Sequence, residues 1–189
     1  VPIRSFDSLI KEISTKLKPG TTLIDVCSVK SYPVDVMLKY TNTKIGVIAT
    51  HPMFGPDSFS TNTKLKMMMY NVRDIGNQFL IWSDYFSNQG IEIIEMSPDE
   101  HDRLAARSQG ITHFLGRMLK QFGIQKTQID TQGFKDLLDL VDQTCNDTWD
   151  LYTDLQLYNP HTLDTITELR KSTESLDKQL REINDVEKR

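Results

Sequence analysis

Apolar residues in the first half of the chain alternate between helical spacing and short β-branched runs. Phe6, Leu9 and Ile13 recur on one face of a helix, and Pro19-Gly20 is a typical helix stop. By the same criteria we predict further helices at 33–40 and 74–90, and strands at 21–26, 44–50, 64–72 and 91–96. Helices and strands in alternation predict right-handed crossovers and a largely parallel sheet.

From Ser97 onward the apolar pattern is helical almost throughout. Ser97, Pro98 and Glu100 supply an N-cap, a first-turn proline and a capping-box acid. Two helical segments follow, one at 133–159, as a single helix or two abutting helices, and a charged amphipathic one at 162–189. The predicted fold class is therefore α/β followed by all-α. Apolar stripes on helices this long need a partner helix, so we expect a homodimer formed through the C-terminal half.

The composition is that of an ordinary globular protein. With 189 residues, 38% of them hydrophobic, and a formal charge of −4, the chain can form one sizeable core or two small ones. Lysine and arginine are scattered, so neither nucleic acid nor an anionic membrane is expected as the main partner. Cys27 and Cys145 suggest neither a disulfide framework nor a metal site, which favours a reducing, cytoplasmic compartment. The first residues lack the apolar region of a signal peptide.

His51 is the first candidate for chemistry. It lies in the stretch GVIATHPMFGPDSFS, residues 46–60, one residue past the predicted strand. In an open α/β sheet the ligand crevice lies outside the carboxyl ends of the strands. An imidazole in that place can act as an acid or base near neutral pH. The alternative is a histidine that caps its strand and packs on Phe54.

Ser28 and Lys30 repeat this arrangement one strand earlier, after the apolar run TLIDV. Their hydroxyl and ammonium groups are expected at the same sheet edge, where they could meet an anionic ligand. The alternative is that both are commonplace turn residues. Two polar clusters that converge on one sheet edge are the less ordinary arrangement, and they favour a small-molecule site.

Gln109, His113 and Arg117 follow at intervals of four residues, so they project from one face of a predicted helix. That face could close over the crevice, but the pattern alone favours a solvated surface. His101, in the first turn of this helix, and His161, next to Pro160, are expected to be ordinary exposed or capping residues.

Three other kinds of site are missing from the sequence. No cluster of His, Cys, Asp and Glu has the spacing of metal ligands, so no metal is expected. No Ser or Cys lies in a nucleophile-elbow context such as GxSxG. The nine glycines form neither the GxGxxG nor the GxxxxGK[ST] pattern.

Four motifs in order resemble the prephenate/arogenate dehydrogenase family of tyrosine biosynthesis. They are DVCSVK, THPMFGPDS, SPDEHDRLAARSQGITHFLGRML and GFKDLLDLVDQTCNDTWDLY. The segment THPMFGP is most similar to the plant-type arogenate dehydrogenase branch of this family. The resemblance implies that residues 1–96 are the C-terminal half of a Rossmann-type NAD(P)-binding domain and that 97–189 form a helical substrate and dimerisation domain.

The resemblance also implies roles for single residues. His51 matches the family's catalytic histidine, which hydrogen-bonds the ring hydroxyl of arogenate or prephenate while hydride leaves for NAD or NADP. Ser28 matches a serine that supports this hydroxyl and the nicotinamide, and Pro52 is assigned with it to the cofactor side. His113 matches a histidine near the substrate. Gln109 and Lys30 are placed with His113 as substrate-binding residues.

Two departures from the family pattern bear on specificity and on the cofactor. Asp139 stands where many bacterial prephenate dehydrogenases have an arginine for the substrate carboxylate, which favours arogenate, whose amino group an aspartate can pair with. The family's glycine-rich turn should precede Asp25 by more residues than are present. We therefore expect an N-terminally truncated fragment that binds NADP weakly or not at all, because this turn supplies much of the cofactor's binding.

Two alternatives remain at this point. One is a non-catalytic remnant that acts as a dimeric module for aromatic amino acids. The other is a different Rossmann-type dehydrogenase with a helical dimer domain, such as a 6-phosphogluconate or hydroxyacid dehydrogenase. The expected location is cytoplasmic, or a plastid if the source is a photosynthetic eukaryote. An unpaired sheet edge could also invite strand exchange between protomers.

Overall fold

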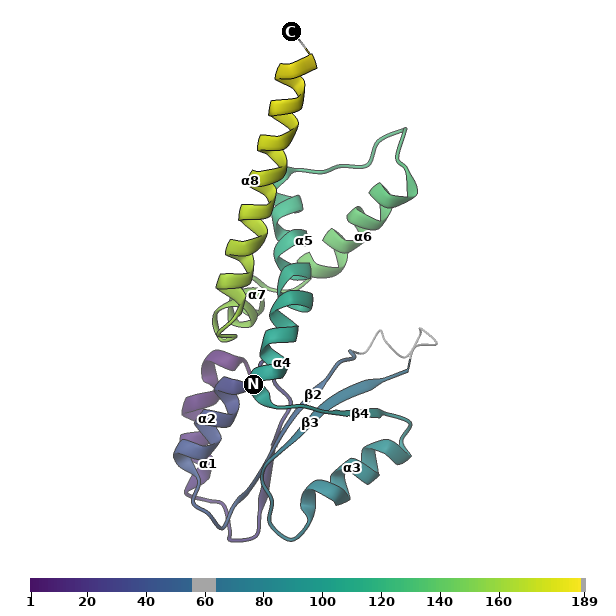
Figure 1. The fold of residues 1–189 in the computed structure, drawn as a ribbon. Helices are drawn as coiled ribbons and strands as arrows, with labels where there is room; N and C mark the ends of the chain where they lie inside the picture. The colour runs from purple at the N-terminus through teal and green to yellow at the C-terminus, as the bar shows by residue number, and fades with distance from the viewer. Residues whose placement is uncertain (56–63, 188–189) are drawn as a thin grey trace.

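The computed structural model describes residues 1–55 and 64–187. The chain up to Glu95 builds a layered unit of sheet and helices, and the chain from Pro98 onward rises from it as a helical arm that ends at the C-terminus (Figure 1). The predicted class, α/β followed by all-α, is confirmed. Among the described residues, none of the helices has both the length and the apolar character that a membrane span requires.

In the described part of the chain, four strands form one sheet in the order β1-β2-β3-β4. They are β1 (Thr22–Asp25), β2 (Gly46–Pro52), β3 (Lys66–Arg73) and β4 (Glu92–Glu95). The β1–β2 and β3–β4 pairings are parallel, as predicted, whereas β2 and β3 are antiparallel. An antiparallel pair, unlike a parallel one, needs no crossover helix between its strands.

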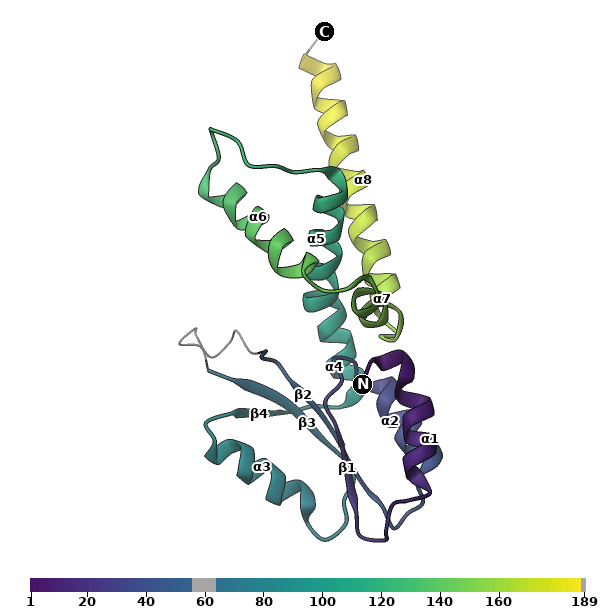
Figure 2. The same cartoon turned by 180° about the vertical axis from the view of Figure 1, so that it is seen from behind.

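Helices cover both faces of this sheet (Figures 1 and 2). A short 3₁₀ turn (Ile3–Ser5) leads into α1 (Phe6–Ser14), which packs with α2 (Ser31–Tyr40) on one face, and α3 (Gln78–Asn88) covers the other. Strand β2 is buried from both sides: Val47 and Ala49 join the α1–α2 core, and Ile48 joins the α3 core. This alternation follows from the two-residue period of a strand.

The helical arm contains α4 (Pro98–Ala105), α5 (Ile111–Phe122), α6 (Gln132–Cys145), α7 (Trp149–Leu157) and α8 (Thr162–Glu187). Its start is as predicted, because the Ser97 hydroxyl accepts a hydrogen bond from the Glu100 amide at 3.3 Å. Between α4 and α5 the helix widens into a π-helical turn at Ala106–Gly110, which the sequence pattern did not reveal. For 133–159 the sequence predicts either one helix or two, and the structure has two, α6 and α7.

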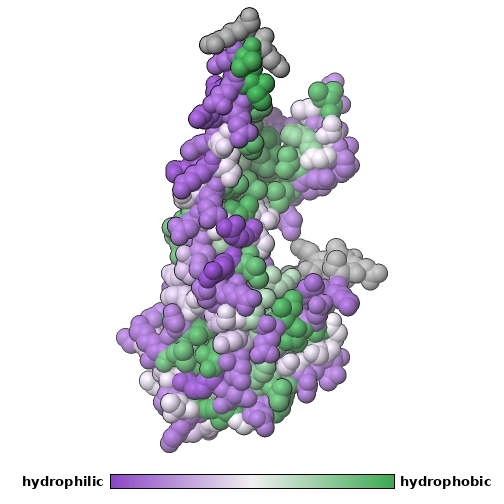
Figure 3. Space-filling view, in the orientation of Figure 1, coloured by the Kyte–Doolittle hydropathy of each residue, from purple (hydrophilic) through white to green (hydrophobic). Residues whose placement is uncertain are grey.

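Apolar side chains remain on the surface of the arm. Leu176, Leu180, Ile183 and Val186 of α8 are each more than half exposed. They follow helical spacing, and apolar atoms (green) line the side of the arm between α8 and α6 in Figure 3. This surface is the one on which the predicted homodimer depends.

Candidate active site

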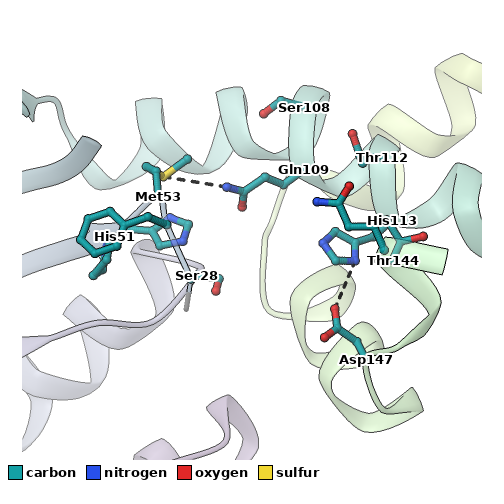
Figure 4. A pocket seen from close by; sticks show the side chains of 13 residues that line it. Ser28, His51, Met53, Ser108, Gln109, Thr112, His113, Thr144 and Asp147 are labelled. Carbon is teal, nitrogen blue, oxygen red and sulfur yellow. Dashed lines mark hydrogen bonds and ion pairs between the residues drawn. The ribbon is translucent and has the colours of Figure 1, made fainter. Parts of the chain in front are cut away.

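A cavity of about 500 Å³ lies where the sheet meets the helical arm. Figure 3 shows the surface hollowed between α6 and the layered unit, and Figure 4 shows the side chains that face each other across the space. We call one side the sheet wall, made by Ser28, His51, Pro52 and Met53, and the other the helix wall, made by Gln109, Thr112, His113, Thr144 and Asp147. The fold thus brings together five of the residues singled out from the sequence: Ser28, His51, Pro52, Gln109 and His113.

His51 lies within β2, opposite Met68 of β3, and not one residue beyond the strand as predicted. The carboxyl end of this strand and that of its parallel neighbour β1 meet at one edge, so His51 and Ser28 share the cavity. The quoted stretch continues to Ser60, but its residues from 56 onward lie outside the described part of the chain.

The imidazole of His51 is buried, and only 6% of the residue is exposed. Its Nδ1 lies 2.8 Å from Nε2 of His101, and the two rings meet edge to face. Within the described residues Nε2 of His51 has no hydrogen-bond partner, so it is the nitrogen left for a ligand. Burial, together with the nearby His101 and Lys30, lowers the pKa of His51 to about 3. The side chain is therefore neutral near physiological pH, and its open nitrogen can accept a hydrogen bond.

The prediction that His101 is an ordinary exposed or capping residue is wrong. Only 3% of it is exposed, and its Nδ1 lies 2.9 Å from Oδ1 of Asp102. Asp102 also accepts hydrogen bonds from the backbone amides of Lys30, at 2.7 Å, and Ser31, at 2.8 Å. Burial raises the pKa of Asp102, but these hydrogen bonds outweigh it and hold the pKa below its usual value. The sequence signal that could have indicated this pairing is a histidine followed directly by an acid in the first turn of a helix.

The prediction that Lys30 binds substrate is also wrong. Lys30 is completely buried, and its ammonium is bonded to the carboxylate of Asp25 and to the carbonyl of Thr50. Asp25 further accepts hydrogen bonds from the amides of Cys27 and Thr50. Lys30 therefore ties the ends of β1 and β2 together behind His51, since a buried ammonium must be paired with charge and acceptors.

The helix wall is more open than the sheet wall. Gln109 belongs to the π-helical turn, and its amide nitrogen lies 3.8 Å from the sulfur of Met53 across the cavity. His113 faces Asp147, with Nδ1 3.7 Å from Oδ2. Burial lowers the pKa of His113, against the opposing effect of Asp147. Gln109 and His113 thus face the cavity, and the solvated alternative does not apply to them.

Arg117 supports the helix wall without lining it. Its guanidinium packs over the rings of Trp149 and Tyr152, with its carbon 5.8 and 5.2 Å from the ring centroids. It also donates a hydrogen bond to the backbone carbonyl of Asp147. These contacts hold the segment between α6 and α7 in place, so Asp147 presents its carboxylate to the cavity.

Gly116 sets how closely α6 approaches α5. A methyl group on its α-carbon would come within 1.9 Å of the Thr144 hydroxyl, so only glycine permits this approach. Thr144 lines the cavity one turn before Asp147, and its hydroxyl bonds the carbonyl of Leu140. Gly116, Thr144 and Asp147 could not be singled out from the sequence, because glycine and threonine inside a helical pattern carry no distinctive spacing.

Asp139 lies outside the residues that line the cavity. It is exposed on α6, one turn before Gln143, which is a lining residue. Among the described residues that line the cavity, the carboxylate is that of Asp147, eight residues further along the chain and beyond the end of α6. The structure thus brings Asp147, and not Asp139, to the other residues that line the cavity.

A nicotinamide cofactor fits the described residues at one end. A groove of about 260 Å³ passes Ile24, Val26 and Cys27 and meets the main cavity at Ser28. Its apolar walls suit a flat ring, and the Ser28 hydroxyl can donate to or accept from that ring's amide. The sequence has no GxGxxG pattern, so its residues fit the ring rather than the pyrophosphate.

The site offers acid–base chemistry. Burial raises the pKa of Cys27 to about 11, so this thiol is not a nucleophile at neutral pH. In residues 1–55 and 64–187, no group of three His, Cys, Asp or Glu side chains is placed to hold a metal ion. A neutral imidazole with one open nitrogen, beside a hydroxyl and facing a carboxylate, is suited to removing a proton from a polar substrate.

Comparison with known proteins gives two family matches. The family described as prephenate dehydrogenase, nucleotide-binding domain, matches residues 1–68. The family described as TYRAAT1-like, C-terminal domain, matches residues 118–189. Between them these matches contain Ser28, His51 and Asp147.

Related proteins extend over nearly the whole chain. Arogenate dehydrogenase 2, chloroplastic, from Arabidopsis thaliana is 35% identical over 188 residues, which cover 94% of this chain and 52% of that protein. The chain thus spans about half the length of this relative. A crystal structure of prephenate dehydrogenase from Aquifex aeolicus with hydroxyphenyl propionate and NAD+ has a TM-score of 0.74 at 19% identity, covering 97% of this chain and 68% of that one. For Synechocystis arogenate dehydrogenase the TM-score is 0.71 at 18% identity, covering 96% and 69%.

Proposed function

This chain belongs to the prephenate/arogenate dehydrogenase family, and we propose that it carries the proton-transfer and substrate-binding parts of an arogenate dehydrogenase. The reaction oxidises the ring carbinol of arogenate, releases carbon dioxide and gives tyrosine. The observation that carries this proposal is the neutral His51, whose open nitrogen lines the cavity opposite Asp147.

In this reaction His51 acts as the base. The O–H bond of the ring carbinol breaks, and the proton goes to Nε2 of His51. A nicotinamide held beside Ser28 would supply the acceptor for the hydride that leaves the same ring carbon. Carbon dioxide then leaves with the ring's aromatisation, and the proton held by His51 returns to the ring oxygen. Aromatisation drives the loss of carbon dioxide, so no covalent nucleophile is required.

Ser28 lies at the meeting point of the cavity and the apolar groove. In the proposed reaction its hydroxyl hydrogen-bonds the ring hydroxyl of the substrate and holds the nicotinamide ring beside it. Pro52 contributes to the same wall and limits the movement of His51's backbone.

Asp147 and His113 favour arogenate over prephenate. Arogenate has an ammonium group where prephenate has a keto group, and the carboxylate of Asp147 can pair with an ammonium in the cavity. Gln109 and His113 are placed to hydrogen-bond the carboxylate of the same side chain. We expect Asp147→Asn to lower kcat/KM for arogenate roughly tenfold relative to prephenate, because the charge-assisted bond is lost.

The matched control for this change is Asp139→Asn, which removes the same charge from the same helical region outside the cavity. Its ratio of kcat/KM values for the two substrates should equal that of the unaltered chain. An equal shift from both variants would argue against a specific contact at Asp147, and a shift from Asp139→Asn alone would restore the original assignment.

The proposed function as a whole is tested with His51→Gln. Turnover of arogenate, followed by the absorbance of the reduced nicotinamide with NAD and with NADP, should fall by about 10²–10⁴. Binding of L-tyrosine, followed by NMR chemical-shift changes, should persist. The control is His161→Gln, on a histidine that pairs with Asp99 outside the cavity. Both cofactors are supplied in large excess, because the chain lacks the GxGxxG pattern that binds the pyrophosphate. Equal turnover by His51→Gln and the unaltered chain would contradict the proposal.

We also propose a homodimer formed through the helical arm. The exposed apolar residues of α8 support it, because a stripe of this length on a monomer would leave a large apolar surface in water. Light scattering of the intact chain should give twice the monomer mass, and Leu180→Glu should reduce it. A monomer at all concentrations would contradict this proposal.

A further inference from the structure

Three side chains lie in a row behind the cavity, and all are at least nine-tenths buried. Asp102, His101 and His51 have exposed fractions of 0, 3 and 6%. Two hydrogen bonds join them, at 2.9 Å from Asp102 to His101 and at 2.8 Å from His101 to His51. The row connects α4 of the helical arm to β2 of the sheet and ends at the open nitrogen of His51.

The hydrogen bonds fix the direction in which protons point along this row. Asp102 accepts from the backbone amides of Lys30 and Ser31, and an ionised carboxylate can only accept. The Nδ1 atom of His101 must then donate to Asp102. In a neutral His101 this leaves Nε2 as an acceptor, so the proton between the two histidines belongs to Nδ1 of His51. The remaining nitrogen of His51, Nε2, carries no proton.

We propose that Asp102 and His101 are positioning residues that hold His51 in the tautomer whose Nε2 can accept a proton from a substrate hydroxyl. We call Asp102, His101 and His51 together the relay. Its role in catalysis rests on the proposed function, but its geometry does not. A free imidazole can adopt either tautomer, and the wrong one would present an N–H donor to the substrate. The relay removes that alternative before the substrate arrives.

The relay also has a role after proton transfer. When the substrate O–H bond breaks and the Nε2–H bond forms, His51 carries a positive charge. The ammonium of Lys30, which helps to lower the pKa of His51 although it is paired with Asp25, opposes that charge. The proton on Nδ1 of His51 can pass to Nε2 of His101, which moves the positive charge next to the carboxylate of Asp102. The charge is thereby placed beside its counter-ion.

The tautomer can be measured directly. Long-range proton–nitrogen NMR correlations distinguish the protonated nitrogen of an imidazole from the unprotonated one, and the chain has only four histidines. In the intact chain at neutral pH, we expect His51 to be protonated at Nδ1 and His101 at Nδ1. A His51 protonated at Nε2 would overturn the proposal. This measurement needs no turnover, so it stands even if the proposed enzymatic activity is absent.

A pair of variants at His101 tests the effect on catalysis. His101→Gln keeps an oxygen that can accept from His51 Nδ1, whereas His101→Leu has a similar size and no acceptor. We expect kcat to fall roughly 10- to 100-fold in His101→Leu, with KM unchanged, because a buried N–H is left unpaired in the active tautomer. His101→Gln should stay within a few-fold of the unaltered chain, and its NMR spectrum should keep the Nδ1-protonated His51.

The matched control is His161→Leu, the same substitution at a histidine that pairs with Asp99 on the surface. It should leave kcat and the tautomer of His51 unchanged. Equal losses from His101→Gln and His101→Leu would overturn the proposal, since they would reflect packing rather than an acceptor. If His101→Leu does not fold, the NMR result on the intact chain and on His101→Gln decides.

Discussion

The two walls of the cavity are built in different ways. The sheet wall presents His51 from strand β2, which is buried on both faces. A hydrogen bond to His101 holds the imidazole, and the buried Lys30–Asp25 ion pair supports the end of the strand. The helix wall presents Gln109 and Asp147 from a π-helical turn and from the segment between two helices, and these side chains are more exposed. Rigid elements hold groups more precisely than connecting segments do.

This difference indicates a division of labour. A base must be kept in one place and one protonation state, and burial with fixed partners provides both. A recognition surface can be altered without disturbing that base, because the helix wall has its own supports in Arg117 and Gly116. Changes in the sheet wall should therefore affect folding and chemistry together, and changes in the helix wall should affect binding first.

The largest effect is expected from Lys30→Met. The substitution leaves the carboxylate of Asp25 and the carbonyl of Thr50 buried without the ammonium that pairs with them. We expect the free energy of unfolding to fall by about 3–5 kcal/mol, as for other buried pairs that lose one partner. Urea denaturation measures this change.

Lys39→Met is the control for that prediction. Lys39 makes an ion pair with Asp7 at 3.2 Å on the surface, where both side chains are exposed. Its removal should lower the free energy of unfolding far less than Lys30→Met does, because solvent screens a surface ion pair. If the two variants were equally stable, the sheet wall would not depend on its buried pair, and the contrast between the two walls would fail.

A smaller effect is expected from Gly116→Ala in the helix wall. The added methyl group meets Thr144, so α6 must move away from α5. Overpacking of this kind costs about 1–3 kcal/mol. Because Thr144 and Asp147 move with α6, binding of L-tyrosine should weaken while the NMR signals of His51 stay in place. Calorimetric titration and the imidazole spectrum measure the two walls separately.

Gly133→Ala provides the matched control, because nothing lies within 4 Å of a methyl group at that position of the same helix. It should bind L-tyrosine as the unaltered chain does. Displaced His51 signals in Gly116→Ala would show that the two walls are coupled rather than independent.

The smallest effect is a pH dependence that originates in the sheet wall. Burial lowers the pKa of His51 from 6.5 to about 3, so between these values the unfolded chain binds more protons than the folded one. The free energy of unfolding therefore falls as pH is lowered through this window. From His51 alone the loss is about 1 kcal/mol between pH 6.5 and 5.5.

His51→Gln should flatten this part of the stability curve. The lowered pKa of His113 acts in the same direction from the helix wall and remains in that variant. Urea denaturation at several pH values in both proteins gives the difference. A curve that is unchanged by the substitution would mean that His51 is not held neutral by the fold.

The sequence was most informative about the sheet wall. Two strands that run parallel place the residues after them at one edge, and this rule alone brought Ser28 and His51 together. The same rule failed for Lys30, because spacing along a chain does not reveal whether an ammonium turns outward to a ligand or inward to Asp25. The antiparallel pairing of β2 and β3 was missed for a related reason, since apolar alternation carries no strand direction.

The helix wall was harder to predict. Gln109 and His113 share one face at α-helical spacing, but the π-helical turn between α4 and α5 has no periodic signature. The prediction of an exposed or capping His101 fails because the burial of this residue depends on His51, which lies 50 positions away in the chain. The place of Asp147 beside the cavity depends on the close approach of α6 to α5 at Gly116, and the sequence does not reveal this approach.

The π-helical turn has a consequence for insertions and deletions in this part of the chain. A turn of this kind holds one residue more than an α-helical turn, and each residue of a helix advances by about 100°. Deleting one residue within Ala106–Gly110 would restore an unbroken α-helix and rotate every side chain on one side of the deletion relative to those on the other. His101 could then keep its contact with His51, or His113 could keep its place in the cavity, but not both.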